Sequence, residues 1–449
     1  MKRIKLDSIL LFALVIPFVM NYRISPKETS FLLFGLIFLG LLFYICLDLL
    51  RIKEKIYYFL KLLVLWFLVV GVIGSAFASA IIVRHQTHPI YMIHDIVLQQ
   101  ESAIRFLLDG KNPYAATYFG TPLEQWHYSE KDINPALYHF VMQPFYLLFA
   151  LPFYFLSNTT IGYFDGRIPL LFLYLIMLIF AGVLVKNREK KLLFIILLAF
   201  NPSVLAHALE GRSDIFMFAF LFFGLYLLHI KKYFVAGIPI ALSFAVKQSA
   251  WPILPFYFAF LYFHRKRNTT NILRASSALQ NESRSLSGSS SRLTSPLSSK
   301  RAPSLRSVRL FARTIILLIP FIITFSVIVL PFFLWDQKAF LDSTIFYLSG
   351  STEHSYPVSG YGLGMLLYQM GIIKDVHQYY PFWIWQLIIG MPVLTALILY
   401  LKKTPSVGRL ILVYGIFLFV FWYLSRYFNN SHLGYLSVVF ITAYFWPEE

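Results

Sequence analysis

The chain has 449 residues, of which 58% are hydrophobic, 18% aromatic and only 13% charged, with a formal net charge of +18. Soluble domains are about half apolar and about a quarter charged, so this composition excludes an ordinary soluble enzyme and predicts an all-α polytopic membrane protein. The net charge does not predict nucleic-acid binding, because residues 265–313 alone hold eleven Lys or Arg and one acid, the pattern of a cytoplasmic loop.

Twelve apolar runs are predicted to cross the membrane, because a crossing helix needs about 20 mostly apolar residues. In chain order they are 8–22, 30–50, 59–83, 167–185, 192–209, 215–230, 233–246, 250–263, 314–335, 381–401, 410–425 and 432–445. A further apolar run, 135–156, contains prolines at 135, 144 and 152, and each interrupts a continuous helix. This run is predicted to enter and return as a re-entrant segment, or to lie against the bundle.

The distribution of basic residues sets the predicted orientation. Lys2, Arg3 and Lys5 are placed in the cytoplasm. If 135–156 also crossed, the basic loops 186–191, 231–232 and 265–313 would all lie outside, against the positive-inside tendency. Twelve crossings place these loops and both termini inside, in a multi-pass protein of the cell membrane.

Five regions follow from this orientation. They are three N-terminal transmembrane helices in 1–83, an extracytoplasmic loop with surface helices and the re-entrant segment in 84–165, a transmembrane core in 166–264, a Ser/Arg-rich cytoplasmic linker in 265–313, and C-terminal transmembrane helices in 314–449 with an outer loop at 336–380.

Two charged stretches next to apolar runs are candidates for a functional site, because charge beside hydrocarbon is costly to keep. His94 and Asp95 open the first, an amphipathic stretch 96–108 that is predicted to be a helix lying along the membrane surface. Gly110 is predicted to end this helix, and Asn112 and Tyr114 lie in a turn just after it. The simpler interpretation of Asp95 is an ordinary helix N-cap.

The second stretch holds Arg212 and Asp214, after a bend predicted at Asn201-Pro202. The simpler interpretation is that Arg212 and Asp214 pair with each other or reach into water. Lys247, at the outer end of 233–246, is either an interface anchor or a cation that meets a phosphate. The outer loop 336–380 adds two further candidates for substrate binding, Glu353 and His354.

No metal or other cofactor is predicted. The histidines show no metal-ligand spacing, and Cys46 is the chain's one cysteine, so a divalent cation is not indicated. The sequence also contains no Gly-rich phosphate loop and no Gly-x-Ser-x-Gly motif, which disfavours a nucleotide-driven pump.

Taken in order, these motifs resemble those of the GT-C superfamily of membrane glycosyltransferases. Within that superfamily they resemble the motifs of the polyprenyl-phosphate-mannose-dependent enzymes of glycosyltransferase family 87 and of the first mannosyltransferase of GPI assembly. The resemblance covers about residues 91–256 and rests on short motifs. They are Asp95, Gly110-Lys111-Asn112-Pro113-Tyr114, Asn134-Pro135-Ala136-Leu137-Tyr138, Asn201-Pro202, Gly211-Arg212-Ser213-Asp214, Lys247 and Trp251-Pro252. The two helices before residue 59 and the Ser-rich linker depart from the family pattern, and His94 stands where many members have a second acid.

The resemblance implies inverting transfer of a hexose, mannose by analogy, from a polyprenyl phosphate to a hydroxyl of a glycan, glycolipid or protein on the extracytoplasmic face. A sugar hydroxyl needs a general base, and Asp95 is expected to supply it. Lys247 and Arg212 are expected to stabilise the lipid phosphate that leaves, and Asp214 to orient Arg212 or the acceptor. Substrate contacts are also expected from the remaining candidates, namely His94, Asn112, Tyr114, Glu353 and His354, with Trp126 as a stacking surface.

Two other functions stay open. The alternative is a transporter or flippase for a lipid-linked glycan, although few charges fall within the apolar runs and no repeat is visible. The second open function is that of a non-catalytic assembly protein. In that case neutral substitution of Asp95, Asp214 and Lys247 should be tolerated.

Overall fold

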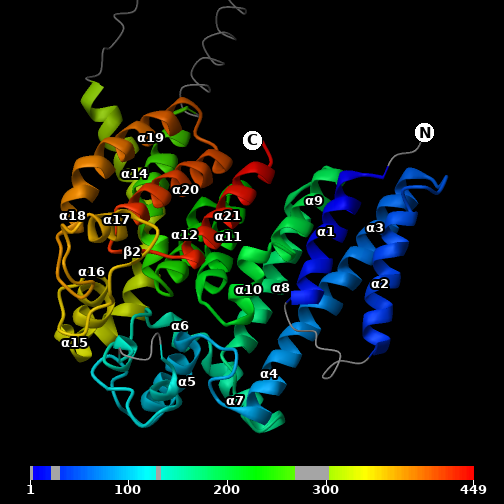
Figure 1. Ribbon diagram of the computed structural model, residues 1–449. Helices are drawn as coiled ribbons and strands as arrows, with labels where there is room; N and C mark the ends of the chain where they lie inside the picture. The colour runs from blue at the N-terminus through cyan, green and yellow to red at the C-terminus, as the bar shows by residue number, and fades with distance from the viewer. Residues whose placement is uncertain (1–3, 22–30, 128–132, 268–302, 449) are drawn as a thin grey trace, which may run out of the picture.

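The computed structural model describes residues 4–21, 31–127, 133–267 and 303–448, and its regular structure is almost entirely helical, which confirms the all-α prediction (Figure 1). The N-terminal helices are α1 (Leu6–Asn21), α2 (Phe31–Cys46), α3 (Glu54–Val69), η1 (Val70–Gly74) and α4 (Ser75–Thr87). The next are α5 (Asp95–Leu108), η2 (Pro122–Gln125), η3 (Pro135–Leu137), α6 (Phe145–Leu148) and α7 (Leu151–Thr160). The central helices are α8 (Arg167–Leu184), α9 (Arg188–Ala199), α10 (Pro202–Leu209), α11 (Asp214–His229), α12 (Tyr233–Phe244), η4 (Gln248–Ile253) and a helix over 254–267.

The C-terminal part contains the remaining elements and a short parallel strand pair. They are α14 (Pro303–Trp335), α15 (Gln337–Leu341), η5 (Asp342–Phe346), α16 (Tyr347–Ser349), β1 (Ser359–Gly360), α17 (Leu363–Gln369), α18 (Phe382–Trp385), η6 (Gln386–Gly390), α19 (Met391–Lys403), α20 (Val407–Tyr423), β2 (Tyr427–Phe428) and α21 (Asn430–Phe445).

Four helical stretches in the described ranges are long and apolar enough to cross a membrane. They are Glu54–Thr87, Arg167–Leu184, Leu310–Trp335 and Phe382–Lys403. The bent pair α9 and α10 makes a fifth if it is one span, and five further apolar helices have 10–17 residues. The chain therefore has the helices of a membrane protein, while the number of twelve crossings stays a prediction.

The predicted bend at Asn201-Pro202 is confirmed. The axes of α9 and α10 differ by 45° there. The Asn201 side chain accepts the N–H of Ser203 and so caps α10, and Pro202 occupies the first turn, where a missing N–H costs nothing.

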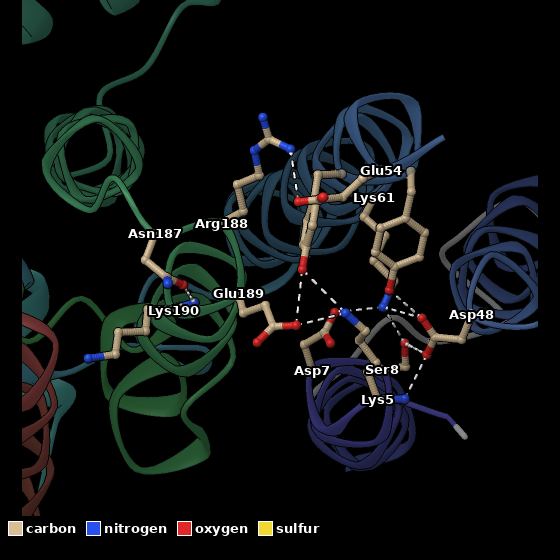
Figure 2. A network of polar contacts seen from close by, with 12 residues as sticks. Lys5, Asp7, Ser8, Asp48, Glu54, Lys61, Asn187, Arg188, Glu189 and Lys190 are labelled. Atoms are coloured by element: carbon tan, nitrogen blue, oxygen red, sulfur yellow. Dashed lines mark hydrogen bonds and ion pairs between the residues drawn. The ribbon is translucent and has the colours of Figure 1, made fainter. Parts of the chain in front are cut away.

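Helices α1, α2 and α3 lie together at one side of the molecule, and a buried charge cluster joins them near the N-terminus (Figures 1 and 2). The Lys61 ammonium lies 2.8 Å from an Asp7 oxygen and 2.7 Å from an Asp48 oxygen. Hydroxyls of Tyr44 and Tyr57 also donate to these two carboxylates. We call Lys61, Asp7 and Asp48 the N-terminal charge cluster; all three are buried, and their bonds hold α1 against α2 and α3.

Exposed ion pairs link this three-helix unit to α9 at the same end of the molecule (Figure 2). Lys5 lies 2.7 Å from Glu189, and Arg188 lies 3.3 Å from Glu54. The N-terminal segment and the loops before α3 and α9, which were all predicted to be cytoplasmic, therefore share one end of the bundle.

Helix α5 forms where it was predicted, and protein covers both its apolar and its polar face. Every residue from Asp95 to Ile104 is buried inside the protein. The polar side chains of this helix have internal partners, because Gln99 donates to the carbonyl of Ala136 and Gln100 to that of Tyr146. The apolar periodicity located the helix correctly, but it did not reveal that the polar face is also covered.

The interrupted run 135–156 forms η3, α6 and the start of α7, none of which is long enough to cross a membrane. Its backbone packs on the end of α12, since the N–H groups of Gln143 and Phe145 donate to the carbonyls of Val246 and Ala245. Most of the predicted linker, 268–302, lies outside the described residues. Helix α14 begins at Pro303, a residue that fits the first turn of a helix, so the last part of the predicted linker, 303–313, is helical.

The outer loop is held against the core by β1, β2 and a buried arginine. Arg426 donates to the main-chain carbonyls of Tyr356, Val376 and Gln378. Gly350 has φ +88°, and a Cβ there would come within 2.4 Å of the Arg426 guanidinium, so glycine permits this contact.

Candidate active site

A cavity of about 450 Å³, which we call the main cavity, lies where α5, the start of α11, the turn after α12, the outer loop and the segment before α21 meet. Five of the predicted residues line it together. They are His94, Asp95, Arg212, Asp214 and Lys247. Residues far apart in the sequence therefore share one cavity of the size that ligand sites have.

A main-chain hydrogen bond joins the two predicted stretches. The His94 N–H donates to the Glu210 carbonyl over 2.8 Å. Gly211 follows with φ +86°, and a Cβ there would lie 2.2 Å from the Val97 side chain. Only glycine allows the turn between α10 and α11 to approach α5 so closely.

Asp95 is the first residue of α5, and His94 is its N-cap, so the simple N-cap interpretation of Asp95 was wrong. One Asp95 oxygen lies 2.5 Å from the His94 Nδ1, and the other lies 3.5 Å from the Asn134 amide nitrogen. The Trp126 ring is 5.7 Å from the His94 ring, and its indole N–H donates to the Ile93 carbonyl. The carboxylate is thus buried, oriented and directed at the main cavity.

The cations of the site have carboxylate partners, but not the predicted ones. Lys247 lies 2.6 Å from Asp214, and Arg212 lies 3.1 Å from Glu210. The Lys247 and Asp214 side chains are 22% and 11% exposed, so this pair is only partly desolvated. Arg212 and Asp214 do not pair with each other, and Asp214 orients the lysine instead.

A second group of buried charges lies next to the segment that leads into the turn at Glu210 and Gly211. Arg84 forms a two-point pair with Glu101, both contacts being 2.8 Å, and Asp165 binds both Arg84 and Arg167 at 2.8 Å. We call these four residues the site charge cluster. Burial opposes the ionisation of Asp165, but the Arg167 guanidinium outweighs it and holds the pKa of this carboxyl well below its usual range.

The site charge cluster contacts the backbone that carries the site. Arg167 donates to the Leu209 carbonyl, one residue before the turn, over 3.2 Å. Its side chain also packs beside Gly211, where an added Cβ would lie 3.1 Å from it. The cluster therefore fixes the position of the segment that presents Arg212 and Asp214.

Four predicted substrate contacts lie outside the lining of the main cavity. Asn112 accepts the Tyr114 N–H in a turn, and the buried Tyr114 hydroxyl donates to the Met142 carbonyl. Glu353 and His354 are exposed, and the His354 ring stacks on a tyrosine. Asn112 and Tyr114 support the wall that contains Met142, while Glu353 and His354 face solvent beyond it.

Sequence reasoning missed Arg426 and His432, which both line the main cavity. Burial lowers the pKa of Arg426 to about 10, with Asp375 opposing the effect. His432 accepts the Asn429 N–H at Nδ1, so the proton of a neutral ring lies on Nε2. The available signal was the polar break 425–432 between two apolar runs, which resembles the break at 210–214.

The lining of the main cavity combines charged and apolar side chains. We call its apolar members Pro252, Ile345, Phe382 and Trp383 the apolar wall. Trp383 is 55% exposed, and it lies at the start of the apolar stretch Phe382–Lys403, most of which faces outward. Within the described residues, no group of three His, Cys, Asp or Glu side chains is placed to hold a metal ion.

No protein-family model, curated protein or solved structure matches this chain. A buried carboxylate with a histidine partner suits proton transfer, and the nearby lysine and arginines suit a phosphate. The apolar wall suits a hydrocarbon chain.

Proposed function

We propose that this protein is a membrane glycosyltransferase that transfers a hexose, most simply mannose, from a polyprenyl-phosphate donor to an acceptor hydroxyl. The observation that carries the proposal is that Asp95, Arg212 and Lys247 line one cavity that also has an apolar wall. A lipid-phosphate sugar needs all of these features at once, because it combines a hydrocarbon chain, an anionic leaving group and a reacting sugar.

The proposed step is an inverting displacement at the anomeric carbon. The acceptor O–H gives its proton to an Asp95 oxygen as its own oxygen bonds the anomeric carbon. The bond from that carbon to the phosphate oxygen breaks, and its electron pair stays with the phosphate. His94 holds the Asp95 carboxylate in position through the 2.5 Å contact.

Lys247 and Arg212 would stabilise the charge that develops on the leaving phosphate. Lys247 acts as a point charge and Arg212 as a planar fork, so the two can bind different phosphate oxygens. Asp214 and Glu210 keep these cations oriented between turnovers, as their contacts of 2.6 and 3.1 Å indicate.

The orientation in the membrane is also part of the proposal. Basic loops gather at the end opposite α5 and α6, as expected for the cytoplasmic side (Figure 1). The main cavity would then face the outer leaflet of the cell membrane, where the polyprenyl chain lies along the apolar wall.

The test is transfer by the purified full-length protein from synthetic polyprenyl-phosphate hexoses, with products identified by mass spectrometry. Asp95→Asn removes the proposed base with little change of shape and should reduce transfer by at least about a hundredfold. Asp109→Asn is the matched control, since Asp109 is exposed at the other end of α5 and should leave transfer unchanged.

Two outcomes would contradict the proposal. Wild-type transfer by the Asp95→Asn protein would show that Asp95 is not the general base. The assembly-protein alternative predicts that this substitution is tolerated. Reconstituted vesicles that move labelled lipid-linked glycan across the bilayer without forming a new glycosidic bond would instead show a flippase.

A further inference from the structure

A second hollow of about 320 Å³ shares part of its lining with the main cavity. Four residues line both spaces. They are His94, Arg212, Tyr356 and Asn429. Because His94 lines this hollow and is also the partner of Asp95, a group bound here would lie next to the residue that contacts the proposed base. We call it the outer hollow.

The walls of the outer hollow combine aromatic rings with amide and hydroxyl groups. Trp126 and Tyr361 provide the rings, and the Tyr361 side chain is 63% exposed. Ser359, Asn429 and the exposed Asn430 provide the polar groups. A side-chain amide both donates and accepts hydrogen bonds, which matches neighbouring hydroxyl groups on a sugar ring. An aromatic face suits the C–H face of the same ring.

The outer hollow differs chemically from the main cavity. Among the described residues, Arg212 is its one lining residue with a permanent charge, and that residue is already paired with Glu210. The apolar wall of Phe382 and Trp383 is not part of it. These walls suit a neutral, hydroxyl-rich ligand better than a lipid or a second phosphate.

The strand pair builds this hollow from two distant segments. Ser359 pairs with Tyr427 and Gly360 with Phe428, which brings Tyr361 beside Asn429. Gly360 has φ +87°, and a Cβ there would lie 2.1 Å from the Phe428 carbonyl oxygen and 2.4 Å from the Asn429 side-chain oxygen. Glycine is therefore required for the close approach that places the polar and aromatic groups together.

We propose that the outer hollow is the acceptor subsite and that the acceptor is a saccharide. This inference rests on the proposed function, because it assigns the second substrate of the same site. The donor sugar and phosphate occupy the main cavity, and the acceptor hydroxyl reaches Asp95 past His94. The enzyme thus extends a glycan.

The experiment measures saccharide binding without any donor. Full-length protein in a detergent that lacks a sugar headgroup is titrated with methyl α-mannopyranoside and with a mannotriose, using saturation-transfer difference NMR. Wild type should bind, and Asp95→Asn should retain binding. Tyr361→Ala should weaken binding about fivefold to tenfold through loss of the ring face. Tyr368→Ala is the control, because this tyrosine of α17 is exposed outside the hollow.

Transfer assays add a second readout, in which acceptor concentration is varied at saturating donor. Tyr361→Ala and Asn430→Ala should raise the acceptor KM and leave the donor KM unchanged. An absence of saccharide binding by the wild type, or equal binding by Tyr361→Ala, would overturn the acceptor subsite. Transfer to a serine peptide but to no saccharide would overturn it too, and would leave the proposed function standing. Saccharide binding without transfer from any donor would refute the proposed function and leave the outer hollow as a saccharide-binding site that is not an acceptor subsite.

Discussion

The N-terminal charge cluster and the site charge cluster are alike in composition but differ in what they support. Both bury carboxylates and cations at contacts of 2.7–2.8 Å between apolar helices. The N-terminal charge cluster joins α1, α2 and α3 and lies at the end of the bundle away from α5. The site charge cluster joins α4, α5 and α8 to the backbone just before the turn that carries Arg212.

The difference shows that buried charge in a membrane protein does not by itself locate a functional site. Intramembrane ionisable residues are a reasonable first hypothesis for function. Here, however, Lys61, the most deeply buried lysine of the described residues, lines neither the main cavity nor the outer hollow. What distinguishes the site charge cluster is its contact with segments that line a cavity.

The largest effect is expected for Asp165→Asn. It leaves Arg84 and Arg167 without a shared carboxylate, and breaking a buried pair of this kind costs about 3–5 kcal/mol. The melting temperature should fall, and transfer per folded molecule should fall with it, because the turn before Arg212 loses its support. Fluorescence-detected size-exclusion chromatography after heating gives the first quantity, and product formation normalised to folded protein gives the second.

The variant Arg84→Lys keeps the charge but removes the two-point contact with Glu101. It tests the same cluster more mildly if Asp165→Asn does not fold. Full activity per folded molecule in both variants would show that the site charge cluster is structural only.

A smaller effect on function is expected for Lys61→Met, which tests the other cluster. The change leaves Asp7 and Asp48 without their ammonium partner, so the melting temperature should fall markedly. Transfer per folded molecule should stay within about twofold of wild type, because the cluster touches no cavity segment. Lys55→Met, on an exposed position of α3, is the control for both measurements. A tenfold loss of specific activity in Lys61→Met would contradict the comparison.

The smallest effect is expected for Glu189→Gln. It removes the ion pair with Lys5, whose side chains are 40% and 59% exposed. Exposed pairs contribute about 0–1 kcal/mol, and salt weakens them. The melting temperature should therefore change little at physiological salt, and any difference should shrink further when salt is raised. A large fall would mean that the three-helix unit depends on this surface contact more than on the buried cluster.

Much of the local structure could be predicted from the sequence, because it depends on short-range rules. Apolar runs located the helices: 215–230 was predicted and α11 spans Asp214–His229. The bend at Asn201-Pro202 and the end of α5 before Gly110, which has φ +72°, follow from proline and glycine stereochemistry. The candidates His94, Asp95, Arg212, Asp214 and Lys247 were found because charge beside an apolar run is costly.

The partners of those residues were decided only by the tertiary structure. Lys247 binds Asp214 across 33 positions of sequence, and Arg426 holds a loop some 50 to 70 positions earlier. Composition and periodicity carry no information about such pairings, because they depend on which helix ends meet once the bundle has packed. The burial of the polar face of α5 and the meeting of β1 with β2 at the outer hollow have the same origin. The residue types therefore indicate the chemistry of the site, while the packing of the helices determines where the charged side chains come together.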